Sequence, residues 1–249
     1  MCIVKKTKKA FTLAEVLIVL GIIGVVAMIT IPNIIVSIEK DYTLGVLKTT
    51  YAQLNQALLA SQVDNGTDVS NWPIPTSSND AASEYFANNY LIPYIKTIHS
   101  CATSNDSECN YKIKFRDYQN SGDYHIMGET GSRAYILPSG VIISVGIWAI
   151  GGDTISHVRT GIAIDINGKK EPNIYGRDVF YAELGLPLSS DNIRAKFLPY
   201  GYYLPRDKLV AGGSYAGDPG CCSKDSGSGY YCFAILFKDG WKFSNDYPW

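Results

Sequence analysis

One carboxylate interrupts an otherwise apolar stretch near the amino end of the chain. Glu15 stands directly before VLIVLGIIGVVAMITI, Val16–Ile31, which holds no charged residue. A charge at bilayer depth costs about 2.5–3.5 kcal/mol, so an acid in such a place usually has a partner and a function. The position of Glu15 therefore predicts that a positively charged group pairs with its carboxylate.

The apolar stretch is long enough to cross a membrane. With its flanks, Phe11–Ala14 and Asn33–Val36, it reaches roughly 20 residues or more, the length of a spanning helix. Four lysines precede it and no Lys or Arg follows until Lys40, so the positive-inside rule places the amino terminus in the cytoplasm. A secretory signal would end in an A-x-A-like cleavage site, and none occurs before Pro32. We therefore predict a retained membrane helix with the rest of the chain outside.

The segment KKAFTLAEVLIVLGIIGVVAMITIPNII, Lys8–Ile35, resembles the amino-terminal signature of type IV prepilins and of type II secretion pseudopilins. The resemblance implies that a prepilin peptidase cuts between Ala10 and Phe11 and then methylates the new amino group of Phe11. It also implies that Phe11 and Glu15 act in filament assembly and that Pro32 kinks the helix. Ala10 departs from the family, in which glycine usually precedes the cut.

Cleavage would give Phe11 a positively charged amino group one helical turn from Glu15. Residues four apart share a helix face, so the two charges can pair within one chain or between chains offset along a filament. The resemblance thus implies a structural subunit of a type IV pilus or a type II secretion filament. Its partners would be other copies of itself, related pilin subunits, the prepilin peptidase and an inner-membrane assembly platform. The precursor would lie in the bacterial inner membrane, and the polymer in the periplasm or at the cell surface.

Two other classes of function remain open. A minor or tip pilin would carry an adhesin or DNA-binding head. Without the four leader lysines the chain has 18 basic and 23 acidic residues, a formal charge of −5, so nucleic acid is an unlikely main partner. The 18 tyrosines favour a β-rich core over a stacking platform, because they do not cluster in the sequence. A membrane-anchored enzyme would need a motif, but GGSYAG, Gly212–Gly217, lacks the second glycine of G-x-S-x-G. We expect no enzyme and no catalytic residue.

Beyond Pro32 the apolar positions form a helical stripe. Leucines and one tyrosine recur every three or four residues, and DNG at Asp64–Gly66 supplies a stop signal with a glycine suited to the left-handed cap. The stripe spans only two heptads, so packing on the chain's own head is preferred to a coiled coil. Its members are Leu44, Leu47, Tyr51, Leu54 and Leu58.

The remaining chain predicts a strand-rich head. Asn65–Ser77 is loop-like, and Ser78–Ile95 favours a short helix that ends before Pro93. Strands follow from Tyr111, with Asn167-Gly168 and Asp239-Gly240 as hairpin turns. The result is an α+β pilin fold, a long helix on an antiparallel sheet. Its predicted parts are a leader (1–10), a transmembrane and filament-core helix (11–36), an amphipathic continuation (37–64) and an extracytoplasmic head (65–249).

Five of the six cysteines follow the apolar stretch, in the compartment predicted to be oxidising. Cys101 and Cys109 bracket a polar loop whose spacing fits no common zinc pattern, so a disulfide is preferred to a metal site with nearby His99. Cys221 or Cys222 should bond Cys232, which begins the strand-like run CFAILFKDGWKF. Cys222 is the preferred partner, and pilins often have a disulfide of this kind near the carboxyl end.

One loop is rich in oxygen ligands. DINGKKEPNIYGRD offers side-chain oxygens for calcium, which some pseudopilins bind in the head. An EF-hand loop has glycine sixth, whereas Gly168 comes fourth here, and a hairpin turn explains the Asn-Gly pair by itself. We therefore expect no metal and no cofactor, with calcium as the weaker alternative. Its candidate ligands are Asp165, Asn167, Asn173 and Asp178.

Overall fold

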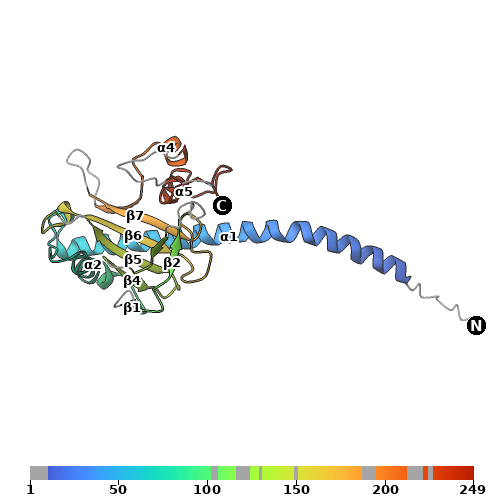
Figure 1. Cartoon of the computed structure of the whole chain (residues 1–249), viewed down its shortest axis with the longest axis horizontal. Helices are drawn as coiled ribbons and strands as arrows, with labels where there is room; N and C mark the ends of the chain where they lie inside the picture. Colours follow the sequence, from blue (N-terminus) through green and yellow to red (C-terminus); the bar gives the residue numbers. More distant parts are fainter. Residues whose placement is uncertain are drawn as a thin grey trace, which may run out of the picture. The chain divides into compact units, whose positions relative to one another are not determined.

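The computed structural model describes residues 11–101, 106–115, 124–128, 131–148, 151–186, 195–211, 221–223 and 227–249 (Figure 1). Internal contacts divide the chain into two units, Met1–Tyr42 and Thr43–Trp249. The boundary falls inside the first helix, so each unit contains one part of that helix.

Helix α1, Leu13–Asn65, is continuous through Pro32. In the first unit its large apolar side chains are exposed, and it is the one helix among the described residues that is long and apolar enough to cross a membrane. The kink predicted at Pro32 stays a prediction. Gly66 follows the last residue with φ +97°, the left-handed conformation expected of a helix-terminating glycine.

The second unit is built on a six-stranded antiparallel sheet with the order β1-β4-β5-β6-β7-β8. The strands from β4 to β8 follow one another along the chain as a meander, which confirms the predicted α+β pilin-like architecture. A separate antiparallel pair, β2 (Lys112–Lys114) and β3 (Tyr124–Ile126), forms a small second sheet. The strands of the main sheet are β1 (His99–Cys101), β4 (Ser132–Ile136), β5 (Ile142–Trp148), β6 (Arg159–Asp165), β7 (Val179–Gly185) and β8 (Lys196–Pro199).

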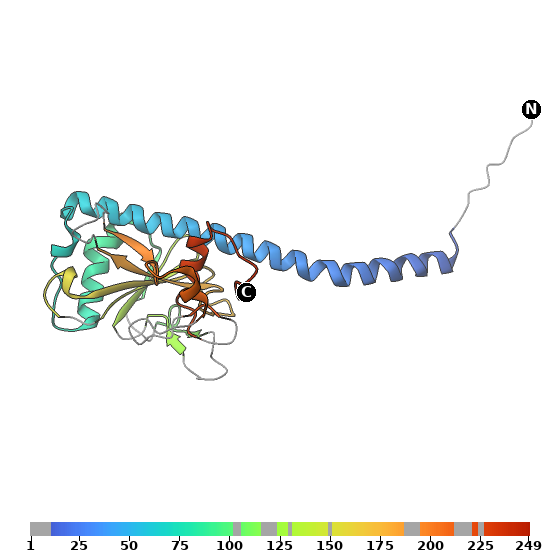
Figure 2. The same cartoon turned by 90° about the horizontal axis from the view of Figure 1, so that it is seen from above.

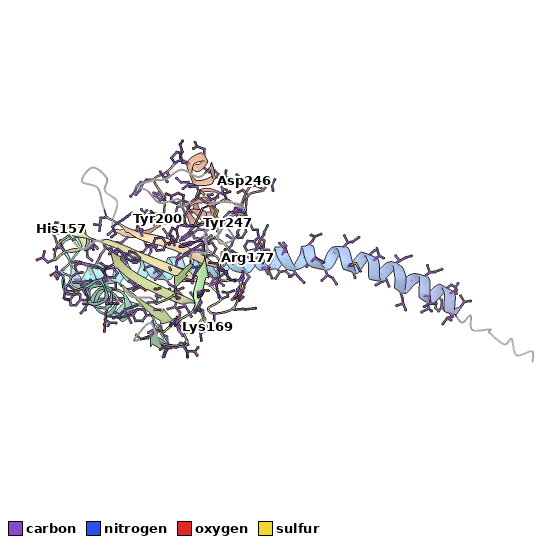
Figure 3. The ribbon with its side chains drawn as sticks, in the orientation of Figure 1. His157, Lys169, Arg177, Tyr200, Asp246 and Tyr247 are labelled. Carbon is purple, nitrogen blue, oxygen red and sulfur yellow. A yellow bond between two sulfur atoms is a disulfide. The ribbon has the colours of Figure 1, made fainter. Side chains whose placement is uncertain are left out.

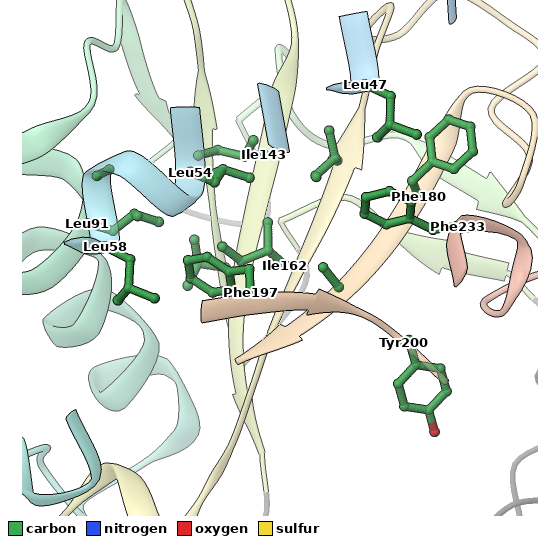
Figure 4. Packing of buried hydrophobic residues seen from close by; sticks show 14 of the residues in the cluster. Leu47, Leu54, Leu58, Leu91, Ile143, Ile162, Phe180, Phe197, Tyr200 and Phe233 are labelled. Atoms are coloured by element: carbon green, nitrogen blue, oxygen red, sulfur yellow. The ribbon is translucent and has the colours of Figure 1, made fainter. Parts of the chain in front are cut away.

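The main core lies between the sheet and the part of α1 that belongs to the second unit. Leu47, Leu54 and Leu58 from the predicted stripe are fully buried, so the stripe does pack on the chain's own head. Figure 4 shows these leucines against apolar side chains of the sheet and of α5. Those partners include Ile143, Ile162, Phe180, Phe197 and Phe233.

The opposite face of the sheet carries a smaller apolar cluster. In Figure 2 the second half of α1 runs along one side of the sheet and the green two-stranded sheet lies on the other side. Ile113 of β2 and Met127, just after β3, are buried there with Ala134, Ile142 and Val179 of the main sheet. The head therefore has three layers: helix, main sheet and small sheet.

Helical turns connect the layers. The segment predicted as a helix over Ser78–Ile95 is helical, but its backbone passes from an α-helix to a π-turn and then a 3-10 turn. It also continues past Pro93, because the final turn begins at Ile92 and a proline in a first turn needs no backbone donor. The elements are η1 (Val69–Asn71), α2 (Asn79–Phe86), η2 (Ala87–Leu91), η3 (Ile92–Tyr94), η4 (Ile155–His157) and α4 (Arg206–Ala211).

The strand predicted from Cys232 is wrong. The run forms helix α5, Cys232–Lys238, in which every residue from Cys232 to Leu236 is buried. A short run that is apolar at successive positions fits a fully buried helix as well as a buried strand, so periodicity could not distinguish them.

The hairpin predicted at Asp239-Gly240 is also wrong, because these residues end α5. Gly240 has φ +71°, and its N–H donates to the Phe237 carbonyl at 3.3 Å. The Trp241 N–H donates to the Leu236 carbonyl at 2.7 Å. This pair of bonds is the Schellman motif, in which Asp-Gly terminates a helix through the same left-handed glycine that a hairpin would use.

The prediction at Asn167-Gly168 needs a smaller correction. Strands β6 and β7 do pair as an antiparallel hairpin, but Asp165 lies opposite Val179, so the connection runs over residues 166–178. Asn-Gly is only the first bend of this longer loop, and Gly168 takes the left-handed conformation with φ +65°. Asn173 takes it as well, with φ 51°.

Candidate functional site

Thr12 and Glu15 bind each other at the start of α1. The Thr12 N–H and hydroxyl both donate to Oε2 of Glu15, each at 2.8 Å, and the Glu15 N–H donates to the Thr12 hydroxyl oxygen at 3.3 Å. This reciprocal arrangement is a capping box, which satisfies backbone donors that the first helical turn leaves free. Glu15 therefore has partners inside its own chain.

The position of the carboxylate has an electrostatic consequence. The amino end of a helix carries a partial positive charge, so a negative group in the first turn is stabilised there. Phe11, just before the box, has a side chain that is 84% exposed. Ala10 and the rest of the leader lie outside the described residues. Thr12 was not predicted as part of the site, although T-x-x-E before an apolar run is a signal for a capping box.

Two disulfides join the cysteine pairs that the sequence favoured. Cys101 and Cys109 are bonded with Cα atoms 6.2 Å apart, and Cys222 and Cys232 with Cα atoms 4.8 Å apart. The second disulfide lies in the main core at the start of α5. Cys221 is buried and belongs to neither disulfide.

The first disulfide also bears on the metal alternative at His99. The His99 imidazole lies 2.8 Å from the Asp106 carboxylate, and the Cys101 sulfur is close to both. A sulfur in a disulfide is not a thiolate, so this cysteine does not offer the ligand that zinc prefers.

The four calcium candidates are brought together in the β6–β7 loop. Asp165, Asp178 and Asn173 are buried, and the Asn167 side-chain oxygen is buried without a hydrogen-bond donor among the described residues. The Tyr111 hydroxyl donates to Oδ2 of Asp165 at 2.7 Å. Tyr111 was not predicted to belong to this cluster, because 54 residues separate it from Asp165.

Backbone donors account for most of the carboxylate contacts. The Asn167 N–H donates to Asp165, and the N–H groups of Asn173 and Ile174 donate to the two oxygens of Asp178 at 2.8 and 2.6 Å. Burial raises the pKa of Asp165 to about 8, with the nearby Asp178 carboxylate as a further cause. Burial also raises the pKa of Asp178. These hydrogen bonds hold the loop in place around two carboxyl groups whose burial is energetically unfavourable.

The donor set of this cluster is compatible with calcium. Its ligand atoms are all oxygens, the type that calcium prefers, and each carboxylate oxygen can accept more than the one bond described. The hydrogen bonds already present are enough to explain the cluster as one that stabilises the conformation of the loop. The expectation of no metal, with calcium as the weaker alternative, stays a prediction.

A second charged cluster anchors the carboxyl end of the chain. The Arg206 guanidinium makes two hydrogen bonds to Asp239, at 2.7 and 2.8 Å, and two to Asp246, both at 2.8 Å. These bonds lower the pKa of both carboxyls. The sequence offered no signal for this cluster, because its members come from α4, the end of α5 and the terminal segment.

The terminal segment also meets the β6–β7 loop. The Tyr247 hydroxyl donates to the Gly176 carbonyl, and the Arg177 guanidinium lies 5.7 Å from the centre of the Trp249 ring. Figure 3 shows Arg177 and Tyr247 close to each other. The loop that holds the buried acids is thus fixed by the carboxyl end as well.

The expectation that the chain is not an enzyme stays a prediction. Gly212–Gly217, the segment compared with a nucleophile elbow, lies outside the described residues, as does the side chain of His125. His157 lies 3.1 Å from the Thr154 hydroxyl in the turn η4, at the surface.

Comparison with known proteins agrees with the amino-terminal site. The model of a family of unknown function, DUF6613, matches residues 34–249, and the model of the prokaryotic N-terminal methylation motif matches residues 5–31. No curated protein and no solved structure matches the chain. The methylation motif includes Thr12, Glu15 and the apolar residues of α1 as far as Ile31. The chain therefore belongs to the DUF6613 family of unknown function and carries a prepilin-type signature at its amino end.

Proposed function

We propose that the protein is a filament subunit of a type IV pilus or a type II secretion system. It is made as an inner-membrane precursor with its amino terminus in the cytoplasm, cut between Ala10 and Phe11, methylated on Phe11 and then polymerised. Its partners are other copies of itself, related pilin subunits, the prepilin peptidase and the assembly platform. The filament lies in the periplasm or at the cell surface.

One observation carries the proposal: the methylation motif ends in a helix whose large apolar side chains are all exposed in the single chain. Such a surface requires lipid or other apolar helices around it. A precursor in the membrane satisfies this requirement first, and a bundle of subunits satisfies it after assembly. Pro32 lies within this surface.

The capping box suggests how processing and assembly are linked. Hydrolysis of the Ala10–Phe11 peptide bond leaves the Ala10 carboxylate on the leader and a protonated amine on Phe11. That amine lies one residue before Thr12, whose N–H and hydroxyl already hold the Glu15 carboxylate. The new cation thus forms close to the acid, where an ion pair can replace or join the capping bonds.

The proposal is tested by neutralising the acid without changing its shape. Glu15→Gln should be cut by the peptidase yet yield fewer filaments, by on the order of ten-fold, because a contact to a charged group is lost. Glu39→Gln, a matched change in the same helix, should assemble normally. Electron microscopy and immunoblotting of sheared filaments measure the yield. Equal yields from Glu15→Gln and the unchanged chain would refute the assembly role.

A second candidate is a minor or tip subunit whose head binds a ligand. A groove lined by aromatic side chains of the head, among them Tyr200, favours this role. The two candidates share the amino-terminal processing and differ in the function of the head.

A further inference from the structure

The face of the sheet away from α1 carries a row of small side chains. Ser132, Gly146 and Gly161 lie opposite one another on β4, β5 and β6, and Ser144 pairs with Ala163 in the next row. The small sheet covers only part of this face, around the cluster of Ile113 and Met127 described above. The rest forms a hollow.

Two aromatic rings lie over the glycines. A methyl group added at Gly146 would stand 2.4 Å from the ring of Trp148, and one added at Gly161 would stand 2.2 Å from the Tyr181 hydroxyl. The rings of Trp148 and Tyr181 are 6.1 Å apart between centres. The glycines are therefore required here to let both rings lie close against the sheet.

The hollow is the first of two neighbouring cavities. It has a volume of about 280 Å³, and the second, of about 240 Å³, lies along β7 and β8. Both cavities are lined by Arg159, Glu183 and Tyr200, so these residues stand where the two meet. Tyr230 lines the first cavity and Tyr203 the second. We call the two cavities together the aromatic groove.

Aromatic side chains line the groove, from buried Tyr200 through half-buried Trp148, Tyr181 and Tyr230 to exposed Tyr203. Tyr200 stands at the end of β8, with its ring away from the packed leucines of the main core (Figure 4). Its ring lies 5.5 Å from that of Tyr181 and 5.9 Å from that of Tyr230, measured between centres. Tyr203 at the far end is 64% exposed. As expected, these tyrosines fill or border the core: Tyr200 belongs to the main buried cluster, and Tyr181 and Tyr230 pack against it. Although they are scattered in the sequence, they also cluster in space at the groove.

The polar groups of the groove are balanced in charge. The Arg159 guanidinium lies 3.5 Å from the Glu183 carboxylate, and their side chains are 56% and 31% exposed. The Glu183 carboxylate raises the pKa of Arg159, which keeps the guanidinium charged. On the floor of the groove the Ser144 hydroxyl donates to the Ser132 hydroxyl at 3.1 Å.

We propose that the aromatic groove binds a neutral glycan of more than one sugar ring. The apolar faces of pyranose rings pack on aromatic side chains, while their hydroxyls both donate and accept hydrogen bonds. Arg159 offers only donors and Glu183 only acceptors, so the pair suits a ligand that has both. Two joined cavities favour an extended ligand over a single small molecule.

The charges of the head disfavour two other ligand classes, nucleic acids and purely apolar molecules. A nucleic acid would meet the Glu183 carboxylate inside the groove and an acidic head around it. A purely apolar ligand would displace water from the Arg159–Glu183 ion pair without replacing the hydrogen bonds lost, which is costly. Glycan binding goes beyond filament formation and does not depend on it, so either proposal can fail while the other holds.

The test uses the full chain in a zwitterionic detergent, because sugar-headed detergents would compete. Maltotetraose, cellotetraose and chitotetraose are the probes, with heparin and a double-stranded DNA oligonucleotide as polyanions. Titration calorimetry measures binding. We expect at least one tetrasaccharide to bind and both polyanions to bind more weakly.

Variants then locate the site. Arg159→Gln should weaken glycan binding by roughly ten-fold, since it removes charged hydrogen-bond donors. Lys169→Gln is the matched control, because it breaks another exposed ion pair of 3.5 Å, with Glu108, and removes the same charge. Tyr203→Ala, at an exposed site that should not unfold the head, should also weaken binding. Lys169→Gln should bind as the unchanged chain does.

Three results would overturn the glycan proposal. The first is that none of the tetrasaccharides binds at millimolar concentration. The second is that Arg159→Gln and Tyr203→Ala bind them as tightly as Lys169→Gln does. The third is that heparin or DNA binds more tightly than every tetrasaccharide, which would assign the groove to a polyanion instead.

Discussion

Thr12 and Glu15 close a capping box at the first turn of α1, with both polar groups of Thr12 on one oxygen of the acid. The acid of the prepilin signature thus has a role in a single chain before any filament forms. It caps the amino end of the helix and is held beside the site where processing would create a cation.

This relationship predicts a role for the Thr12 hydroxyl. Thr12→Val keeps the backbone donor to Glu15 but removes the hydroxyl, and loss of a helix cap costs about 1 kcal/mol. We expect fewer filaments from Thr12→Val and normal numbers from Thr12→Ser. Thr30→Val is the control, because Thr30 lies in the same helix and its hydroxyl donates to the Val26 carbonyl, at 2.9 Å, within the helix itself. Filament counts equal in Thr12→Val and Thr30→Val would show that the hydroxyl is dispensable.

The same substitution should have opposite effects at two glycines. Gly161→Ala places a methyl group against Tyr181 and Trp148, so we expect the free energy of unfolding to fall by about 1–3 kcal/mol. Gly45 lies in an exposed part of α1 where a new methyl group would meet no neighbouring side chain. Gly45→Ala should therefore raise the free energy of unfolding by up to about 1 kcal/mol. Urea unfolding followed by circular dichroism measures both. Similar changes at the two sites would contradict the packing described.

The buried Asp165 predicts a stability that falls with rising pH. Its pKa is raised from 3.8 to about 8, so between these values the folded chain binds a proton that the unfolded chain has lost. The stability contributed by neutral Asp165 is present at low pH and is lost as the pH rises through about 8. Asp165→Asn, which stays neutral, should flatten this slope, whereas Asp207→Asn at the surface should not.

Calcium provides a check on the same cluster. With only protein donors around Asp165 and Asp178, millimolar Ca²⁺ at pH 8 should leave the unfolding midpoint unchanged. A rise in the midpoint that Asp165→Asn abolishes would establish the weaker, calcium-binding alternative.

Low pH should weaken the ion-pair cluster that anchors the carboxyl end of the chain. The pKa values of Asp239 and Asp246 are lowered by Arg206, so the stability that this cluster gives is present above their usual range and lost as the pH falls. We expect Arg206→Gln to lose stability at pH 6 and to depend less on pH between 6 and 3 than the unchanged chain. Lys208→Gln, in the same short helix, should behave like the unchanged chain. Equal acid profiles for all three chains would exclude the cluster as a source of the pH dependence.

The sequence was most informative where one pattern repeats over many residues. The length of the apolar run predicts a helix long enough to cross a membrane, and the stripe of Leu47, Leu54 and Leu58 predicts a buried helix face. Helix α1 has both features. Strand composition likewise predicted the meander. These features depend on local periodicity, which the chain displays directly.

Short segments and clusters between distant segments were harder to predict. Cys232–Lys238 is apolar at nearly every position, so it has no period, and Asp239-Gly240 suits a helix end as well as a hairpin. The aromatic groove and the contact from Tyr111 to Asp165 join residues from several strands. Only the sheet register places these residues together, and no sequence spacing reveals it.

The mature amino terminus provides the most direct test of the proposed function. Mass spectrometry of the exported protein should identify a chain that begins at Phe11 and carries one N-methyl group. Glu15→Gln should show the same terminus, since that variant is expected to fail only at assembly. A chain that still carries residues 1–10, or one that begins after the apolar run, would contradict the account.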